Sequence, residues 1–377
     1  MSKNFKKYSP FLIIVIFMGA LLWLSPFSND TSGLKAQQKE EELLEGTVTN
    51  SVNKNENIQE EEILITKGSL KDQKITVEND NSYIVNTREF NKGDGVIVTY
   101  KKLANGENSF YIVDYLRTKP LLWLFIIFIV VVVFVTRWQG IGSLLGMLFS
   151  FIILFKIILP KILIGANPVV MAIIGAALII PITFYLSHGI NRKTTIAMIG
   201  TLLTLIITSL IAYVFADWGN LTGFASEEAS YLQLGTAKNI DFKSLVLAGI
   251  IISLMGILDD VTISQTSIVQ QLKAAKEKIS FFELYKRATI VGRDHIASIV
   301  NTLILIYAGA SLPLLLLLLD YSESLGTVIN YEFMAEEIIQ TLVASIGLIL
   351  AIPITTLLAC LTIGKAKAPP EGFHHTH

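Results

Sequence analysis

The sequence predicts an all-α polytopic membrane bundle of about eight transmembrane helices, with a small extracytoplasmic β-barrel of OB-like type inserted after the first helix. Three observations predict this fold class. Only 16% of the 377 residues are charged and 52% are hydrophobic, whereas about 25% of a soluble domain is charged. Apolar runs long enough for membrane helices recur along the chain. Residues 28–119 differ, with about 30% charged residues against about 12% elsewhere, which indicates one inserted soluble domain.

Charge and cysteine content exclude several classes of function. The net charge is −1, so no basic surface for nucleic acid is expected. The only cysteine is Cys360, which excludes an internal disulfide and a cysteine-pair metal or redox motif. We find no P-loop, no nucleophile elbow and no HExxH motif. The sequence therefore implies no cofactor, names no metal and gives no positive sign of an enzyme.

The N-terminal residues 1–27 are expected to form a short cytoplasmic tail and a signal-anchor helix. The apolar run Phe11–Leu24 follows Lys3, Lys6 and Lys7 and resembles the apolar part of a signal peptide. No small-residue cleavage site follows it, which favours an uncleaved anchor. A cleaved signal peptide is the alternative.

A polar tether at 28–43 should lead into an extracytoplasmic β domain at 44–119. Short alternating or β-branched stretches, separated by Asn, Asp and Gly turns, predict five or six strands there; they lie at 44–50, 62–66, 73–77, 82–85, 95–100 and 109–113. This number of strands fits a small OB-like barrel. Because the domain is net acidic, we expect a structural or partner-binding module and no nucleic-acid partner.

Seven further spans are expected in a membrane domain at 120–363, followed by a cytoplasmic tail at 364–377. Each apolar segment can reach the roughly 20 residues that a span needs; the segments are Pro120–Val135, Ile141–Leu159, Pro168–Leu186, Thr194–Ala216, Ser244–Leu258, Ile296–Leu319 and Ile338–Ile363. Lys and Arg residues gather in alternate loops, which places both termini in the cytoplasm and the β domain outside.

Reporter fusions at Asn105 and Lys367 should therefore report opposite sides of the membrane. If both report the same side, the topology is wrong, and so is any argument that places polar residues at a common depth.

Residues 264–292 predict an amphipathic cytoplasmic segment between two spans. Apolar residues recur there at three- and four-residue spacing and lysines lie between them. Ser280 and Glu283 form a capping box, which predicts that a helix begins there. The segment is expected to lie on the inner leaflet; a cytoplasmic partner helix is the alternative.

Oxygen-rich side chains at the end of the sixth span form the first candidate site. Asp259, Asp260, Thr262, Ser264 and Gln265 follow one another closely, and ionisable residues within spans are functional candidates by default. Adjacent residues of a helix point about 100° apart, so the two aspartates should serve two faces. They are expected to line a path for a solute, an ion or a proton. A structural ion pair at the membrane edge is the alternative.

A second polar group is expected at the same cytoplasmic end. Arg293, Asp294 and His295 precede the seventh span, Asn301 lies about 10 Å deeper, and His188 ends the fourth span. We expect one of the two aspartates within about 8 Å of these side chains, with Arg293 as the direct partner. Structural roles are the alternatives: a helix start for the acid and a bond across helices for the amide.

Two prolines, Pro181 and Pro353, are expected to kink their helices. They lie in similar segments, Gly175–Thr183 and Gly347–Thr355. The match suggests a parallel internal repeat, although apolar strings also match by chance.

At these motifs the chain resembles the YibE/F-like family of bacterial multipass membrane proteins. The resemblance rests on Ser187–Gly189, Gly256–Val261, Val291–Ile296, Asn301–Thr302 and Ser345–Pro353, and it covers most of 120–363. It implies a location in the bacterial cytoplasmic or inner membrane, and it implies no established reaction.

The sequence thus favours a transporter or permease for a small solute or ion. The alternative is a scaffold or envelope-assembly factor that binds partners through the outer β domain. An intramembrane aspartyl enzyme is a third reading, but adjacent aspartates on one helix do not match a catalytic dyad. The expected partner is the lipid bilayer. The sequence leaves open whether the protein also binds a small solute or cation, a second copy of the chain or another membrane protein.

Overall fold

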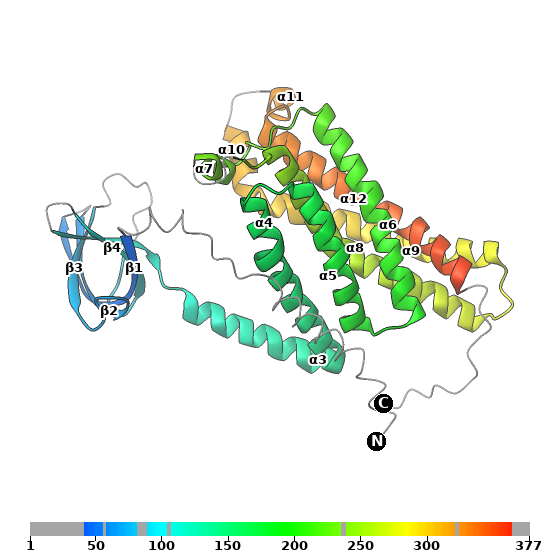
Figure 1. The fold of residues 1–377 in the computed structure, drawn as a ribbon, viewed down its shortest axis with the longest axis horizontal. Helices are drawn as coiled ribbons and strands as arrows, with labels where there is room; N and C mark the ends of the chain where they lie inside the picture. The colour runs from blue at the N-terminus through cyan, green and yellow to red at the C-terminus, as the bar shows by residue number, and fades with distance from the viewer. Residues whose placement is uncertain are drawn as a thin grey trace, which may run out of the picture. The chain divides into compact units, whose positions relative to one another are not determined.

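A computed structural model describes residues 41–55, 58–80, 89–103, 107–234, 239–320 and 324–363. The expected anchor helix, most of the tether, the expected strand at 82–85 and the C-terminal tail lie outside these residues. The chain divides into a unit of residues 26–135, which holds the strands, and a mainly helical unit that includes residues 136–377 (Figure 1). Each unit is described by itself.

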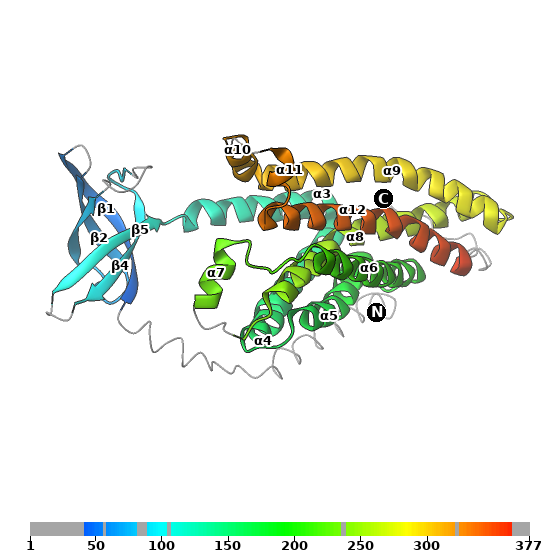
Figure 2. The same ribbon diagram turned by 90° about the horizontal axis from the view of Figure 1, so that it is seen from above.

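The first unit contains a curled antiparallel sheet, which confirms five of the expected strand segments. In the described residues its strands are β1 (Glu41–Asn55), β2 (Ile58–Lys67), β3 (Lys74–Asp80), β4 (Gly95–Lys102) and β5 (Asn108–Tyr115), in the order β3-β2-β1-β4-β5. β1 is long because its first half pairs with β4 and its second half with β2. Register shifts bend β1, and the edge strands β3 and β5 approach each other. The sheet is therefore a half-barrel (Figure 2).

Alternate residues of the strands fill the interior of this half-barrel. The largest buried side chains there include Leu44, Ile63 and Ile65. Gln59 holds the chain before β4 across the interior, because its Oε1 accepts from Phe90 N at 3.1 Å and its Nε2 donates to Phe90 O at 3.2 Å.

Glu61, two residues further along β2, is an exception to this apolar interior. Its side chain is fully buried, and neither carboxyl oxygen has a hydrogen-bond partner in the part of the chain that the structure describes. Burial away from water raises the pKa of Glu61 from 4.5 to about 7.

The helical part consists of long apolar helices, as expected for a membrane protein. Among the described residues, six helical stretches are long and apolar enough to cross a membrane. They are 118–163, which comprises α3 (Thr118–Ile153), the π-helical turn η2 (Leu154–Ile158) and α4 (Leu159–Leu163), together with α5 (Pro168–His188), α6 (Arg192–Trp218), α8 (Phe242–Ala275), α9 (Phe281–Ala310) and α12 (Glu332–Thr362). Shorter helices are α7 (Glu227–Leu234), α10 (Leu312–Asp320) and α11 (Leu325–Val328).

The two spans expected between 120 and 159 fall within the single stretch 118–163. Its 46 residues would measure about 69 Å at 1.5 Å per residue, enough to cross a hydrocarbon core of roughly 30 Å twice. The backbone of Arg137 is non-helical, with φ 54° and ψ −129°. The stretch is therefore interrupted between the two expected spans.

The expected segment at 264–292 is made of the ends of two long helices rather than a separate helix. α8 continues without a break to Ala275, and α9 begins at Phe281. Ser280 Oγ accepts a hydrogen bond from Glu283 N at 3.3 Å, so the predicted helix start is confirmed. The position of this segment on a membrane leaflet stays a prediction.

Small and hydroxyl-bearing residues bring α6, α8 and α12 together at the centre of the bundle. A Cβ added at Gly200 would lie 2.6 Å from Thr355 Oγ1, and one added at Gly347 would lie 2.7 Å from Thr208 Oγ1. Such close approach is typical of helix pairs in membranes. α5 and α12 run continuously through Pro181 and Pro353, and kinks at these prolines stay a prediction.

Gly142→Ala should lower the melting temperature of the purified protein by several degrees. A Cβ at this position would overlap the backbone carbonyl oxygen of Leu186, and overpacking against backbone costs about 1–3 kcal/mol. Gly249→Ala is the matched control, because no described atom lies within 4 Å of its added Cβ. Equal melting temperatures for the two variants would contradict the packing of α3 on α5.

Candidate functional site

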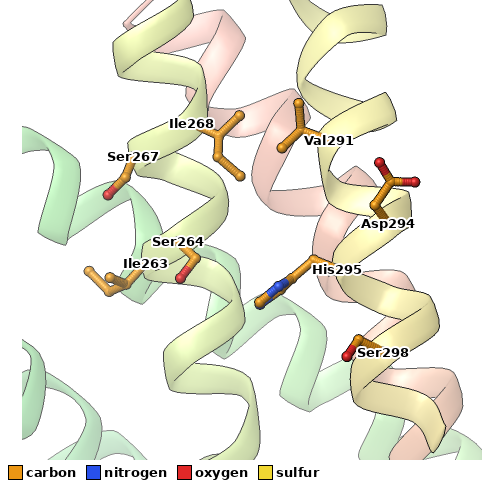
Figure 3. Close-up of a pocket in the computed structure, with 8 residues that line it drawn as sticks. All are labelled: Ile263, Ser264, Ser267, Ile268, Val291, Asp294, His295 and Ser298. Carbon is orange, nitrogen blue, oxygen red and sulfur yellow. The ribbon is translucent and has the colours of Figure 1, made fainter.

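A groove lies between α8 and α9. Its volume is about 560 Å³, and Figure 3 shows the eight residues that line it. Five of them are polar: Ser264, Ser267, Asp294, His295 and Ser298. The His295 side chain reaches from α9 toward Ser264 of α8 (Figure 3). The structure therefore brings three predicted residues, Ser264, Asp294 and His295, into one cavity.

Ser267 and Ser298 belong to the same groove, and helical spacing in the sequence places each of them on the face of a predicted site residue. Their spacing was the available signal, because Ser267 follows Ser264 by three residues and Ser298 follows Asp294 by four. Both spacings put side chains on one face of a helix.

A second group of polar side chains brings Asp260 of α8 near the end of α5 and the beginning of α6. Asp260 and Lys193 lie close enough to His188 to interact with it electrostatically. Lys193 Nζ also donates to Ser267 Oγ at 3.1 Å. Ser267 lines the groove, so polar side chains run from the end of α5 to the groove between α8 and α9.

Asp259 faces another cavity, on the α5 side of α8. This cavity has a volume of about 290 Å³ and is lined by residues of α3, η2, α5 and α8. Asp259 Oδ1 is buried and has no hydrogen-bond partner among the described residues. The adjacent aspartates therefore face different surroundings, as their 100° separation requires.

Thr262 and Gln265 are buried and bridge helices. Thr262 Oγ1 lies 2.7 Å from Thr201 Oγ1 of α6. Gln265 Nε2 donates to Thr356 Oγ1 of α12 at 2.6 Å and to Ala288 O of α9 at 3.0 Å. Neither side chain lines the groove or the Asp259 cavity. Their place in a solute path stays a prediction.

The remaining predicted residues, Arg293 and Asn301, are exposed on α9. Within the described ranges Arg293 forms no ion pair, so the expected pair with an aspartate is not seen. No hydrogen bond from the Asn301 side chain to another helix is found in those ranges either. Asp294 does not stabilise a helix start, because α9 begins thirteen residues earlier, at Phe281.

Two further observations concern acidic residues. In the described part of the chain, no group of three or more His, Cys, Asp or Glu residues is placed to hold a metal ion. A third cavity of about 300 Å³ lies between α7, α8 and α12, and Glu228 and Glu336 line it together with Gln340.

Comparison with known proteins identifies the helical part. A family model described as YibE/F-like protein matches residues 124–365, which is more than half of the chain and contains both aspartates and the groove. No curated protein and no solved structure matches the chain.

Proposed function

The chain belongs to the YibE/F-like family, and from that premise we propose that this membrane protein transports a small solute or ion. The groove of about 560 Å³ between α8 and α9 is the observation that carries the proposal. Both helices are candidate spans, yet the residues that line the groove include an acid, an imidazole and three hydroxyls.

The cost of polar groups in a bilayer supports this function. An ionisable side chain within a span is expensive unless it faces a water-filled cavity or a partner. Asp294 and His295 line the groove, and Asp260 interacts electrostatically with His188. Polar groups along such a groove could provide hydrogen bonds for a hydrated solute.

The topology inferred from the lysine and arginine distribution completes the proposal. Both termini lie in the cytoplasm of a bacterium, the β domain lies outside the cytoplasmic membrane, and the groove opens near the cytoplasmic face. We also infer that the β domain is OB-like, since a long β1 pairs with both β2 and β4 and the sheet edges approach each other.

A comparison of cell contents tests the transport function. The small-molecule and metal contents of a deletion strain should differ from those of its parent in one solute. The wild-type gene should restore that solute, and Asp260→Asn should not. Identical contents in deletion strain and parent, under conditions where the protein is made, would contradict transport.

A scaffold role is the second candidate, because a row of paired residues in the β domain exposes two large apolar side chains. Leu43 of β1 and Tyr111 of β5 flank Thr99 of β4 in register, and their side chains are 67% and 60% exposed. Such a row suits a protein partner. If Tyr111→Glu abolishes complementation and Asp260→Asn does not, the scaffold role replaces transport.

A further inference from the structure

We propose that the cavity beside Asp259 binds a small organic cation with an apolar body, which replaces a proton on the Asp259 carboxyl group. The proposal rests on the proposed function, because it names a class of solute for the bundle. Binding at this cavity can nevertheless be measured without transport.

The walls of the cavity are mostly apolar. Met147 and Phe151 of α3, Leu154 of η2, and Ile252 and Met255 of α8 contribute to them. Methionine side chains adapt to irregular shapes, and an aromatic ring close to a cation attracts it. These walls therefore fit an apolar body that carries a positive charge.

The hydroxyl groups at the cavity already have partners. Ser150 Oγ donates to Gly146 O at 2.9 Å, and Thr183 Oγ1 lies 3.1 Å from both Ile179 O and Ile180 O. A solute that needs several hydrogen bonds, such as a sugar, would find few free groups here.

Asp259 is the polar group that remains. It is the one charged side chain among the described residues that line the cavity, and its buried Oδ1 has no partner there. Asp260, on the same helix, acts on it electrostatically, while α3, η2 and α5 contribute no charged side chain to the lining. Because both of these carboxyl groups carry negative charge when ionised, the complementary occupant is a cation.

The exchange with a proton follows from the cost of an isolated charge. An ionised carboxyl group in apolar surroundings requires a cation or takes up a proton. When a quaternary ammonium ion enters, the protonated carboxyl group releases its proton to water and forms an ion pair. One positive charge enters and one leaves, so the charge of the cavity does not change.

Two local features mark the rim of the cavity. Gly256 lines it and is exposed, and a Cβ added at Gly256 would meet no described atom within 4 Å, so the cavity is open on this side. The π-helical turn η2 begins at Leu154, which also lines it, and π-helical turns occur frequently at functional sites.

The test uses the full-length protein in detergent and benzyltrimethylammonium as the probe. Calorimetry in buffers of different ionisation enthalpy counts the protons released. We expect saturable binding with release approaching one proton per cation, and affinity that rises by about tenfold per pH unit while Asp259 is protonated. Absence of binding, or binding without proton release, would overturn the proposal.

Two variants remove the site in different ways, and folding is checked by melting temperature. Asp259→Asn should weaken binding at least tenfold and abolish proton release. Gly256→Leu should block binding although the carboxyl group remains. Glu277→Gln removes an exposed acid of the loop between α8 and α9 and should bind as the wild type does.

The neutral analogue neopentylbenzene separates a cation site from an apolar one. If it binds the wild type and Asp259→Asn equally well, and the cation does not bind better, the cavity holds an apolar chain such as a lipid tail and the proposal fails. Cation binding with proton release but no flux in proteoliposomes would leave the site in place and reject the transport function. If benzyltrimethylammonium flux persists in the Asp259→Asn variant, the cation site at Asp259 is rejected and the transport function is kept.

Discussion

Asp260→Asn should abolish transport while the protein still inserts into the membrane and keeps its melting temperature. The substitution preserves the shape of the side chain and removes the charge that acts on His188. Because Asp260 is exposed on α8, its loss leaves no buried cation without a partner. Complementation of the deletion strain, together with the amount of protein in the membrane, measures the effect.

The structural alternative predicts a different result for the same variant. If Asp260 served only in an ion pair at an exposed position, its removal would cost about 0–1 kcal/mol of stability and would leave complementation intact. Glu277→Gln is the charge-matched control and should complement fully. Full activity of Asp260→Asn would eliminate a role for this carboxyl group in the path.

Glu61→Leu should stabilise the β domain at pH 8 and remove most of its dependence on pH. The pKa of Glu61 is about 7 in the folded protein, above its ordinary value of 4.5. Between pH 4.5 and pH 7 the folded state therefore binds more protons than the unfolded state does. The contribution of Glu61 to stability is therefore fully present below pH 4.5 and is lost as pH rises through 7, by about 3 kcal/mol in all at 1.36 kcal/mol per pKa unit.

Hydrogen exchange in the full-length protein measures this effect, through the protection of amides in β2 and β3 at pH 5 and pH 8. After correction for intrinsic exchange, the wild-type protein should show weaker protection at pH 8 than at pH 5. The Glu61→Leu variant should show the same protection at both pH values. Glu62→Leu is the control, because Glu62 is exposed on the opposite face of β2. An equal fall in protection in both variants would show that Glu61 does not carry the dependence.

The β strands were predictable because their signal is local. The alternation of β-branched residues at 95–100 predicted β4, which begins at Gly95. The burial of Glu61 was not predictable, because it stands in the acidic run Glu60–Glu62, which is typical of a solvated surface. Only the pairing of β2 between β1 and β3 shows that Glu61 points inward with Ile63.

Hydropathy located the membrane helices but not their ends. The apolar run at 244–258 ends well before α8 does, at Ala275, because polar residues continue a helix as well as apolar ones. For the same reason the alternative role of Asp294 at a helix start is wrong, because Asp294 lies well inside α9.

The candidate site was predictable only within each helix. Helical spacing placed Asp259 and Asp260 on different faces, and their different surroundings agree with that. The spacing does not tell which helix lies opposite. Two features of the site depend on packing between segments that are far apart in the sequence. One is the pair of hydrogen bonds from Gln265 to α9 and α12, and the other is the cavity that Asp259 lines together with residues of α3 and α5.

Cysteine labelling of the groove tests the central claim, a wet path between α8 and α9, most directly. The single cysteine, Cys360, is buried, and Cys360→Ala provides a background without reactive thiols. In this background Ser264→Cys and Ser298→Cys should react with a charged, membrane-impermeant thiol reagent added to inside-out vesicles of the native membrane, in which the cytoplasmic face is accessible. Leu305→Cys, at a position of α9 that is 63% exposed and expected to face lipid, should not react. If Ser264→Cys and Ser298→Cys are as unreactive as Leu305→Cys, the groove is dry and the transport function is contradicted.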